Sequence, residues 1–123
     1  MKTQKTILVI EDEKSLRGAI KDILHLKGFL CLEARNGREG VELAFLKHPD
    51  LILLDLIMPE MDGMTALAKI RENTWGATVP VIILTNLSAT NEHPVDDAVT
   101  SYLIKSDWKL HDVVKKIEGI LEM

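Results

Sequence analysis

Cysteine is almost absent from the sequence: Cys31 is the only one, so no disulfide can form within the chain. Its apolar neighbours predict a small buried strand residue rather than a reactive thiol. The four histidines are scattered, without the spacing of a zinc site or a catalytic histidine. The longest apolar run, residues 51–58, is too short to span a bilayer, and no secretory signal opens the chain. We therefore expect a cytoplasmic protein.

A stripe of positive charge is also missing. The net charge is −4 and the basic residues are spread along the chain, which predicts no direct binding to nucleic acid and no membrane association. With 46% hydrophobic and 28% charged residues, the composition is typical of a soluble globular protein. The 123 residues suit one domain. We expect it to occupy residues 1–123, with a core of about residues 5–122 and no output domain.

Short apolar segments alternate with stretches of helical spacing. The predicted strands are Thr6–Ile10, Phe29–Ala34, Leu51–Leu56, Val79–Thr85 and Ser101–Ile104. Helices are predicted around residues 16–24, 41–45, 64–71, 94–99 and 110–121. The fourth of these would be a short helix opened by Pro94, and Asn36-Gly37 is predicted as a turn. This alternation favours parallel pairing through right-handed crossovers, and hence a doubly wound α/β fold.

Polar residues stand at the carboxyl ends of four of these strands, where open parallel sheets bind their ligands. Glu11 and Asp12 follow the first strand, Asp55 closes the third, Thr85 closes the fourth, and Lys105 follows the fifth. Asp55 is the one charge in an otherwise apolar strand, and a buried carboxylate is costly unless it has partners. We therefore interpret the five residues as one site.

The residue types of this site indicate phosphoryl transfer with a divalent cation. Clustered carboxylates repel one another unless a cation offsets their charge, and oxygen ligands suit Mg²⁺, with Mn²⁺ as a substitute. A carboxylate can also act as a nucleophile and form an acyl phosphate, for which Asp55 is the candidate. The ammonium of Lys105 and the hydroxyl of Thr85 could then each take one phosphoryl oxygen.

Residues 7–13, 53–63 and 102–105 resemble the receiver (CheY-like) domains of bacterial two-component response regulators. The resemblance implies a flavodoxin-like (βα)5 fold with strand order 2-1-3-4-5 and helices on both faces. It also implies that Asp12 and Asp55 ligate Mg²⁺, together with the backbone carbonyl of Ile57, and that Glu11 acts through water. Tyr102 and the phosphate-binding threonine would form a switch pair.

By the same resemblance, a histidine kinase or a histidine phosphotransfer protein would supply the phosphoryl group. A downstream protein target or an output domain would read the switched surface, and the chain would be a monomer or a phosphorylation-dependent dimer. The chain departs from the family at Ser106, where proline is usual, at Asn86, where a small residue is common, and in a short interval before Lys105.

An aspartate-nucleophile phosphatase would carry a second acid two residues after the nucleophile, where this chain has Ile57, so we expect no enzyme beyond self-phosphorylation and slow autodephosphorylation. A flavin or nucleotide binder is disfavoured because Glu11-Asp12-Glu13 would repel phosphate. A receiver-like module that binds a partner without phosphorylation stays open.

Overall fold

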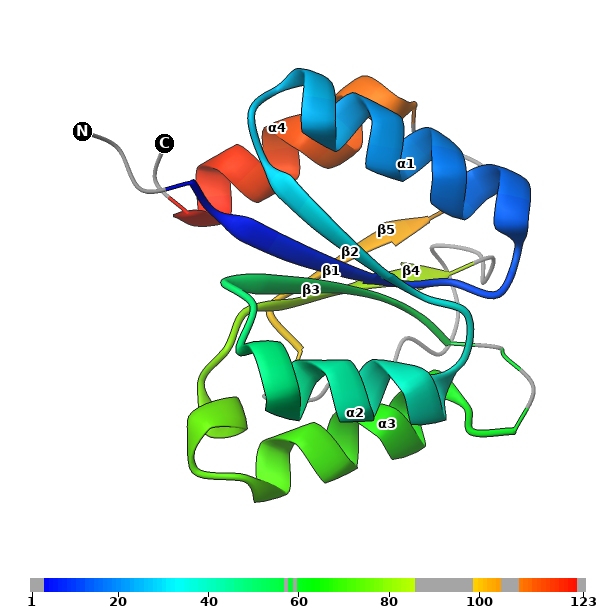
Figure 1. The fold of residues 1–123 in the computed structure, drawn as a ribbon, viewed down its shortest axis with the longest axis vertical. Helices are drawn as coiled ribbons and strands as arrows, with labels where there is room; N and C mark the ends of the chain where they lie inside the picture. The colour runs from blue at the N-terminus through cyan, green and yellow to red at the C-terminus, as the bar shows by residue number, and fades with distance from the viewer. Residues whose placement is uncertain (1–3, 57, 59, 86–98, 105–108, 122–123) are drawn as a thin grey trace.

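The structure is a computed structural model, and it describes residues 4–56, 58, 60–85, 99–104 and 109–121. A parallel sheet in the order β2-β1-β3-β4-β5 lies between two layers of helices (Figure 1). Its strands are β1 (Thr6–Ile10), β2 (Leu30–Ala34), β3 (Leu51–Asp55), β4 (Val81–Thr85) and β5 (Ser101–Ile104). The helices are α1 (Lys14–Leu26), α2 (Gly37–Lys47), α3 (Gly63–Glu72), the short 3₁₀ helix η1 (Trp75–Ala77) and α4 (Leu110–Leu121). The predicted doubly wound fold and strand order are confirmed.

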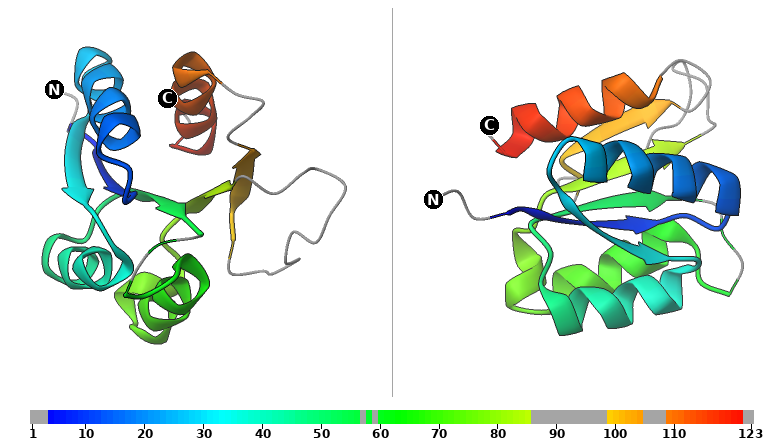
Figure 2. Two further views of the ribbon diagram at one scale, coloured as in Figure 1. Left: turned by 90° about the vertical axis from the view of Figure 1, so that its right-hand side faces the viewer. Right: turned by 45° about the horizontal axis from the view of Figure 1, so that its top comes forward.

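In the described part of the chain, α1 and α4 cover one face of the sheet and α2 and α3 cover the other, as the left panel of Figure 2 shows end-on. Alternate residues of one strand point to opposite faces, so β1 and β3 serve both layers of the core. Ile7, Val9 and Leu53 pack in the layer under α1 and α4. Leu8 and Leu54 pack in the layer under α2 and α3. All five are fully buried, which explains the unbroken apolar character of the inner strands.

Some element boundaries differ from the prediction. Phe29 precedes β2, because its N–H donates to the carbonyl of Leu24 at 3.0 Å and so completes the end of α1. Asn36 and Gly37 begin a helix instead of a turn: the Asn36 side chain caps α2 by accepting from the N–H of Glu39 at 2.8 Å. The predicted local turn was wrong because the same residue type serves turns and helix caps equally well.

The connection from α3 to β4 also departs from the prediction, which had neither η1 nor the start of β4 at Val81. The guanidinium of Arg71 holds this connection by donating to the carbonyls of Gly76 and Val79 at 2.8 and 2.6 Å. The ring of Trp75 stacks on that of His48, at the end of α2, with their centroids 4.5 Å apart. A side chain reaching across the connection therefore organises a segment that has no periodic pattern of its own.

The helix predicted around residues 94–99 falls largely outside the described residues; Val99, which is described, belongs to no helix. Ser106 and Asp107, which precede the last helix, also lie outside the described part. At the described start of α4, the N–H of Lys109 donates to the carboxylate of Asp112 at 2.7 Å, which is the half of a capping box in which the third helical residue reaches back. Among the described helices, none has the length and apolar character needed to cross a membrane.

Candidate functional site

Three carboxylates meet at the carboxyl edge of the sheet. One oxygen from each of Glu11, Asp12 and Asp55 lies within 4.8 Å of those of the other two. The register explains the meeting: β1 pairs with β3 so that Ile10 lies opposite Leu54, which brings the next residue of each strand to the same place. Glu11 is fully buried and Asp55 is 5% exposed, whereas Asp12 is exposed. The cluster thus has a buried floor and one carboxylate facing solvent.

The loop between β1 and α1 is fixed by hydrogen bonds that converge on Glu11. Its N–H donates to the carbonyl of Ala34 at 3.0 Å, which extends the pairing of β1 with β2 by one residue. Its carboxylate accepts from the N–H of Glu13 at 3.0 Å. Its carbonyl accepts from the guanidinium of Arg17 at 2.9 Å. The backbone that carries Glu11 and Asp12 is therefore held from β2 on one side and from α1 on the other.

The loop after β3 is closed by Gly63, the first residue of α3. Its N–H donates to the carbonyl of Leu56 at 2.8 Å. A Cβ at this position would overlap the carbonyl oxygen of Asp55 and lie 2.8 Å from the Cα of Leu56. Asp62 caps the helix by accepting from the N–H of Thr65 at 2.8 Å. The helix can begin directly against the backbone of Asp55 only because glycine has no side chain.

The three carboxylates fit a hard divalent cation. Ligands on opposite sides of an octahedral Mg²⁺ lie roughly 4.2 Å apart, given Mg–O distances of about 2.1 Å. Oxygens within 4.8 Å of one another can therefore reach one ion after a small adjustment. The donor set contains only oxygen, which suits Mg²⁺ or Mn²⁺ better than a thiolate- or imidazole-binding metal.

A hollow of about 490 Å³ adjoins the exposed member of this cluster, Asp12, and is also lined by Arg35, Asn36, Arg38 and Glu60. Two ion pairs order its rim: Arg35 with Glu39 at 2.8 Å and Arg38 with Glu42 at 3.0 Å. The backbone N–H and the side chain of Arg35 both donate to the Glu39 carboxylate and lower its pKa. The hollow therefore gives solvent and solutes access to the carboxylate cluster past a charged rim.

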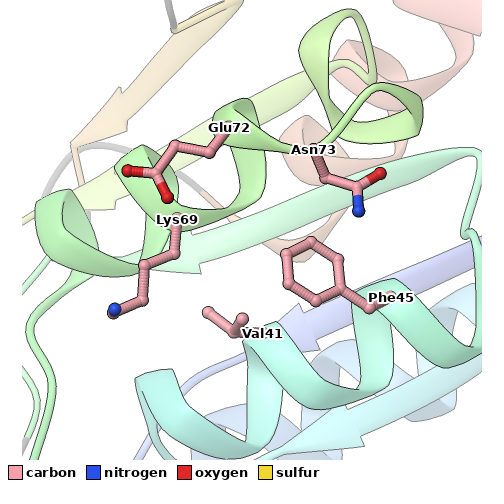
Figure 3. Close-up of a pocket in the computed structure, with 5 residues that line it drawn as sticks. All are labelled: Val41, Phe45, Lys69, Glu72 and Asn73. Atoms are coloured by element: carbon pink, nitrogen blue, oxygen red, sulfur yellow. The ribbon is translucent and has the colours of Figure 1, made fainter.

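A second hollow, of about 410 Å³, lies between α2 and α3. Figure 3 shows Val41 and Phe45 on α2, Lys69 and Glu72 on α3, and Asn73 at its end. Its lining shares no residue with the carboxylate cluster and contains one acid. We therefore do not assign it to the same site.

The model of the response regulator receiver domain matches residues 7–118. The chain belongs to the response regulator receiver domain family. This result confirms the resemblance seen in the sequence, and the observed strand order agrees with the fold expected from it.

The first curated relatives that match this chain are longer proteins. The nitrate/nitrite response regulator protein NarL of Escherichia coli is 35% identical over 114 residues, which cover 91% of this chain and 52% of NarL. The chain spans about half, or less, of the length of the first curated relatives that it matches. The chain is a receiver domain, and its match to those longer proteins does not assign their activities to it.

Two solved receiver structures have ligands at their sites. The receiver domain of sensor histidine kinase PA1611 from Pseudomonas aeruginosa contains a magnesium ion coordinated in the active-site cleft; it is 27% identical, with a TM-score of 0.84 over 95% of this chain and 97% of that one. The response regulator TrrA from Thermotoga maritima was solved in complex with Mg²⁺-BeF; it is 28% identical, with a TM-score of 0.83 over 94% and 98%. Both of these receiver domains were thus solved with Mg²⁺.

Not all predicted site residues of this receiver domain fall in the described part of the chain. Thr85 ends β4, two strands from β1, and its side chain lies outside that part. Tyr102 is described on β5, opposite Ile83, where it is half-buried and packs against the core layer under α2 and α3. Lys105 and Ile57 lie outside the described residues, as do Asn86 and Ser106. Their roles stay predictions.

Two residues near the carboxylates were missed in the sequence. In the sequence, Arg17 is one of several charged residues of a predicted amphipathic helix, and Gly63 is predicted as a loop glycine. The pair Asp62-Gly63 before a helical stretch does signal a helix start. No pattern in the neighbouring sequence predicts the contact of Arg17 with Glu11, because this contact depends on how α1 packs on the sheet.

Proposed function

We propose that this receiver domain is a phosphorylation switch whose phosphoacceptor is Asp55. The observation that carries the proposal is the position of this side chain: it closes the central strand β3, is 5% exposed, and has carboxylate oxygens of Glu11 and Asp12 within 4.8 Å. A carboxylate in this setting is costly unless positive charge joins it. The family membership of the chain and the Mg²⁺-BeF complex of TrrA support the same assignment.

The chemical step is a displacement at phosphorus. A carboxylate oxygen of Asp55 forms a bond to phosphorus while the bond between phosphorus and the donor's histidine nitrogen breaks, and that nitrogen keeps the electron pair. Such transfers need little covalent assistance but need the attacking and leaving atoms to be placed in line and the charge to be neutralised. The pairing of β3 with β1 and the close contact of Gly63 hold the attacking carboxylate in place.

Asp12 and Asp55 would hold the cation directly, with the backbone carbonyl of Ile57, and Glu11 would hold it through water. Mg²⁺ bound there would offset the charge of the carboxylates and of the phosphoryl oxygens, and Mn²⁺ would substitute for it. Lys105 and Thr85 would each contact one phosphoryl oxygen, and Tyr102 would move with Thr85 as the switch.

A histidine kinase or a histidine phosphotransfer protein would be the donor, in the cytoplasm of a bacterium. The switched surface would act on a downstream protein or an output domain, as a monomer or a phosphorylation-dependent dimer. The chain would not act as an enzyme on other substrates, because the residue two positions after Asp55 is Ile57 and not a second acid.

Mass spectrometry tests the phosphoacceptor directly. The chain is incubated with Mg²⁺ and acetyl phosphate, and its intact mass is followed with and without a chelator. We expect one Mg²⁺-dependent phosphate adduct in the natural chain and in Asp22→Asn, which removes an exposed acid of α1, and none in Asp55→Asn. An adduct that persists in Asp55→Asn, or its absence from the natural chain, would contradict the proposal. If the natural chain gains no adduct, a module that binds its partner without phosphorylation is favoured.

A further inference from the structure

We propose that Arg17 and Glu33 are positioning residues for the cation site, and that their contact sets how tightly the site binds Mg²⁺. The inference rests on the proposed function, because it concerns the same carboxylates. Neither residue belongs to the cluster itself. Arg17 lies on α1 and Glu33 on β2, so the pair bridges the two elements that flank the loop bearing Glu11 and Asp12.

Arg17 makes two contacts with different atoms of its guanidinium. Nη1 donates to the backbone carbonyl of Glu11 at 2.9 Å, and Nε donates to Oε1 of Glu33 at 3.3 Å. The side chain of Arg17 is only 14% exposed. The planar guanidinium fixes the angle between its donors, so binding Glu33 through one edge orients the other donor towards the loop. Lys21 also contacts Glu33, with its Nζ 3.4 Å from Oε2, and helps to hold that carboxylate in place.

The carbonyl that Arg17 holds belongs to the residue between β1 and the exposed cluster member Asp12. A change in the direction of that carbonyl rotates the peptide unit that leads to Asp12. The carboxylates of Glu11 and Asp12 would then leave the arrangement in which their oxygens lie within 4.8 Å of that of Asp55. Residues that orient metal ligands without touching the metal typically change its affinity about 10–100-fold when they are replaced. Arg17 contacts the ligand-bearing backbone directly, so an effect in this range is expected.

For Arg17, charge alone predicts the opposite change in the affinity for Mg²⁺. Removing the positive charge of Arg17 beside an acidic cluster should strengthen Mg²⁺ binding, since one repulsive cation is lost. The positioning role predicts that the same change weakens binding. The ion pair between Arg35 and Glu39 supplies a matched control, because it has the same two charge types and Arg35 lines the hollow beside Asp12. In the described part of the chain, its hydrogen bonds join Arg35 to Glu39 and involve no atom of the loop between β1 and α1.

The experiment is a Mg²⁺ titration of ¹⁵N-labelled protein, in which the amide signals of the loop give the dissociation constant and the whole spectrum reports folding. Arg17→Met is compared with Arg35→Met, and Glu33→Gln with Glu39→Gln, at one pH and one salt concentration. We expect Arg17→Met to weaken binding about 10-fold or more. Arg35→Met should leave binding unchanged or slightly stronger. Glu33→Gln should weaken it more than Glu39→Gln does, and the double variant Arg17→Met/Glu33→Gln should be no weaker than Arg17→Met alone.

Each outcome decides the question. The natural chain could bind Mg²⁺ while Arg17→Met and Arg35→Met bind it with equal affinity. That result would overturn the positioning role and leave the proposed function intact. A natural chain without Mg²⁺-dependent shifts would overturn both. If Arg17→Met does not fold, Glu33→Gln decides alone: it keeps the arginine charge and replaces the charged acceptor of Arg17 Nε by a neutral amide oxygen, which holds the guanidinium less firmly. An affinity of Glu33→Gln equal to that of Glu39→Gln would then refute the inference.

Discussion

Replacing Gly63 by alanine should damage the site through the backbone of Asp55. The added Cβ would overlap the carbonyl oxygen of Asp55 and lie 2.8 Å from the Cα of Leu56 and 3.0 Å from the carbonyl carbon of Asp55. All three are backbone atoms of the strand end, so no side chain can rotate to make room. Either α3 retreats from the sheet or the end of β3 shifts, and both changes displace the phosphoacceptor.

The expected cost follows from the kind of clash. Overpacking a well-filled interior typically costs about 1–3 kcal/mol. We expect the upper half of this range for Gly63→Ala, because retreat of α3 would also lengthen the 2.8 Å hydrogen bond from its N–H to Leu56. For a domain of this size, each 1 kcal/mol corresponds to a fall in melting temperature on the order of 3–6 °C. Phosphorylation by acetyl phosphate should fall as well, even where the protein is fully folded.

Urea unfolding followed by circular dichroism measures the free energy change, with Gly18→Ala as the control. Gly18 lies inside α1, and a Cβ there would meet nothing within 4 Å. That substitution should stabilise the protein by about 0.5–1 kcal/mol, since alanine is the better helix former. A Gly63→Ala protein as stable as Gly18→Ala, with an unchanged phosphorylation rate, would refute the proposed contact with Asp55.

Two further predictions concern single side chains. Asn36→Ala should lower the free energy of unfolding by about 0.5–2 kcal/mol, because it removes the cap whose oxygen accepts from Glu39 at 2.8 Å; Asn36→Asp should restore most of it, and equal urea midpoints for all three proteins would contradict the capping role. Burial, and then the charge of Glu33, raise the pKa of Cys31 from 9.0 to about 12. The native thiol should therefore not react with a disulfide reagent at pH 8, whereas the unfolded thiol should, and rapid native labelling would disprove its burial. Because the unfolded thiol ionises first, stability should fall as the pH rises from 9.0 towards 12, by up to about 1.4 kcal/mol per pH unit.

Much of the site could be predicted because its signals are local. Asp55 stands out as a lone charge at the end of an apolar strand, and Glu11 and Asp12 follow another strand, so residue type and position suffice to group them. The turn predicted at Asn36 was wrong for an equally local reason, since its side chain can serve a turn or a helix cap and only the packing of α2 selects between them.

Other features of the site depend on contacts between residues far apart in the chain. Arg17 meets Glu33 only because α1 lies across β2, and Gly63 touches Asp55 only because α3 begins against the end of β3. The periodicity of either segment is the same with or without these contacts, so no pattern within the segment can reveal them.

The alternation of apolar strands and amphipathic helices, the single buried cysteine and the phosphoacceptor candidate Asp55 were determined by the sequence itself, because each follows from the chemistry of neighbouring residues. The tertiary structure alone decided that Ile10 lies opposite Leu54, so that three carboxylates converge, and that an arginine on α1 holds the backbone beneath them. Strand register and helix packing result from the fit of whole surfaces, and that fit exists only once the chain has folded.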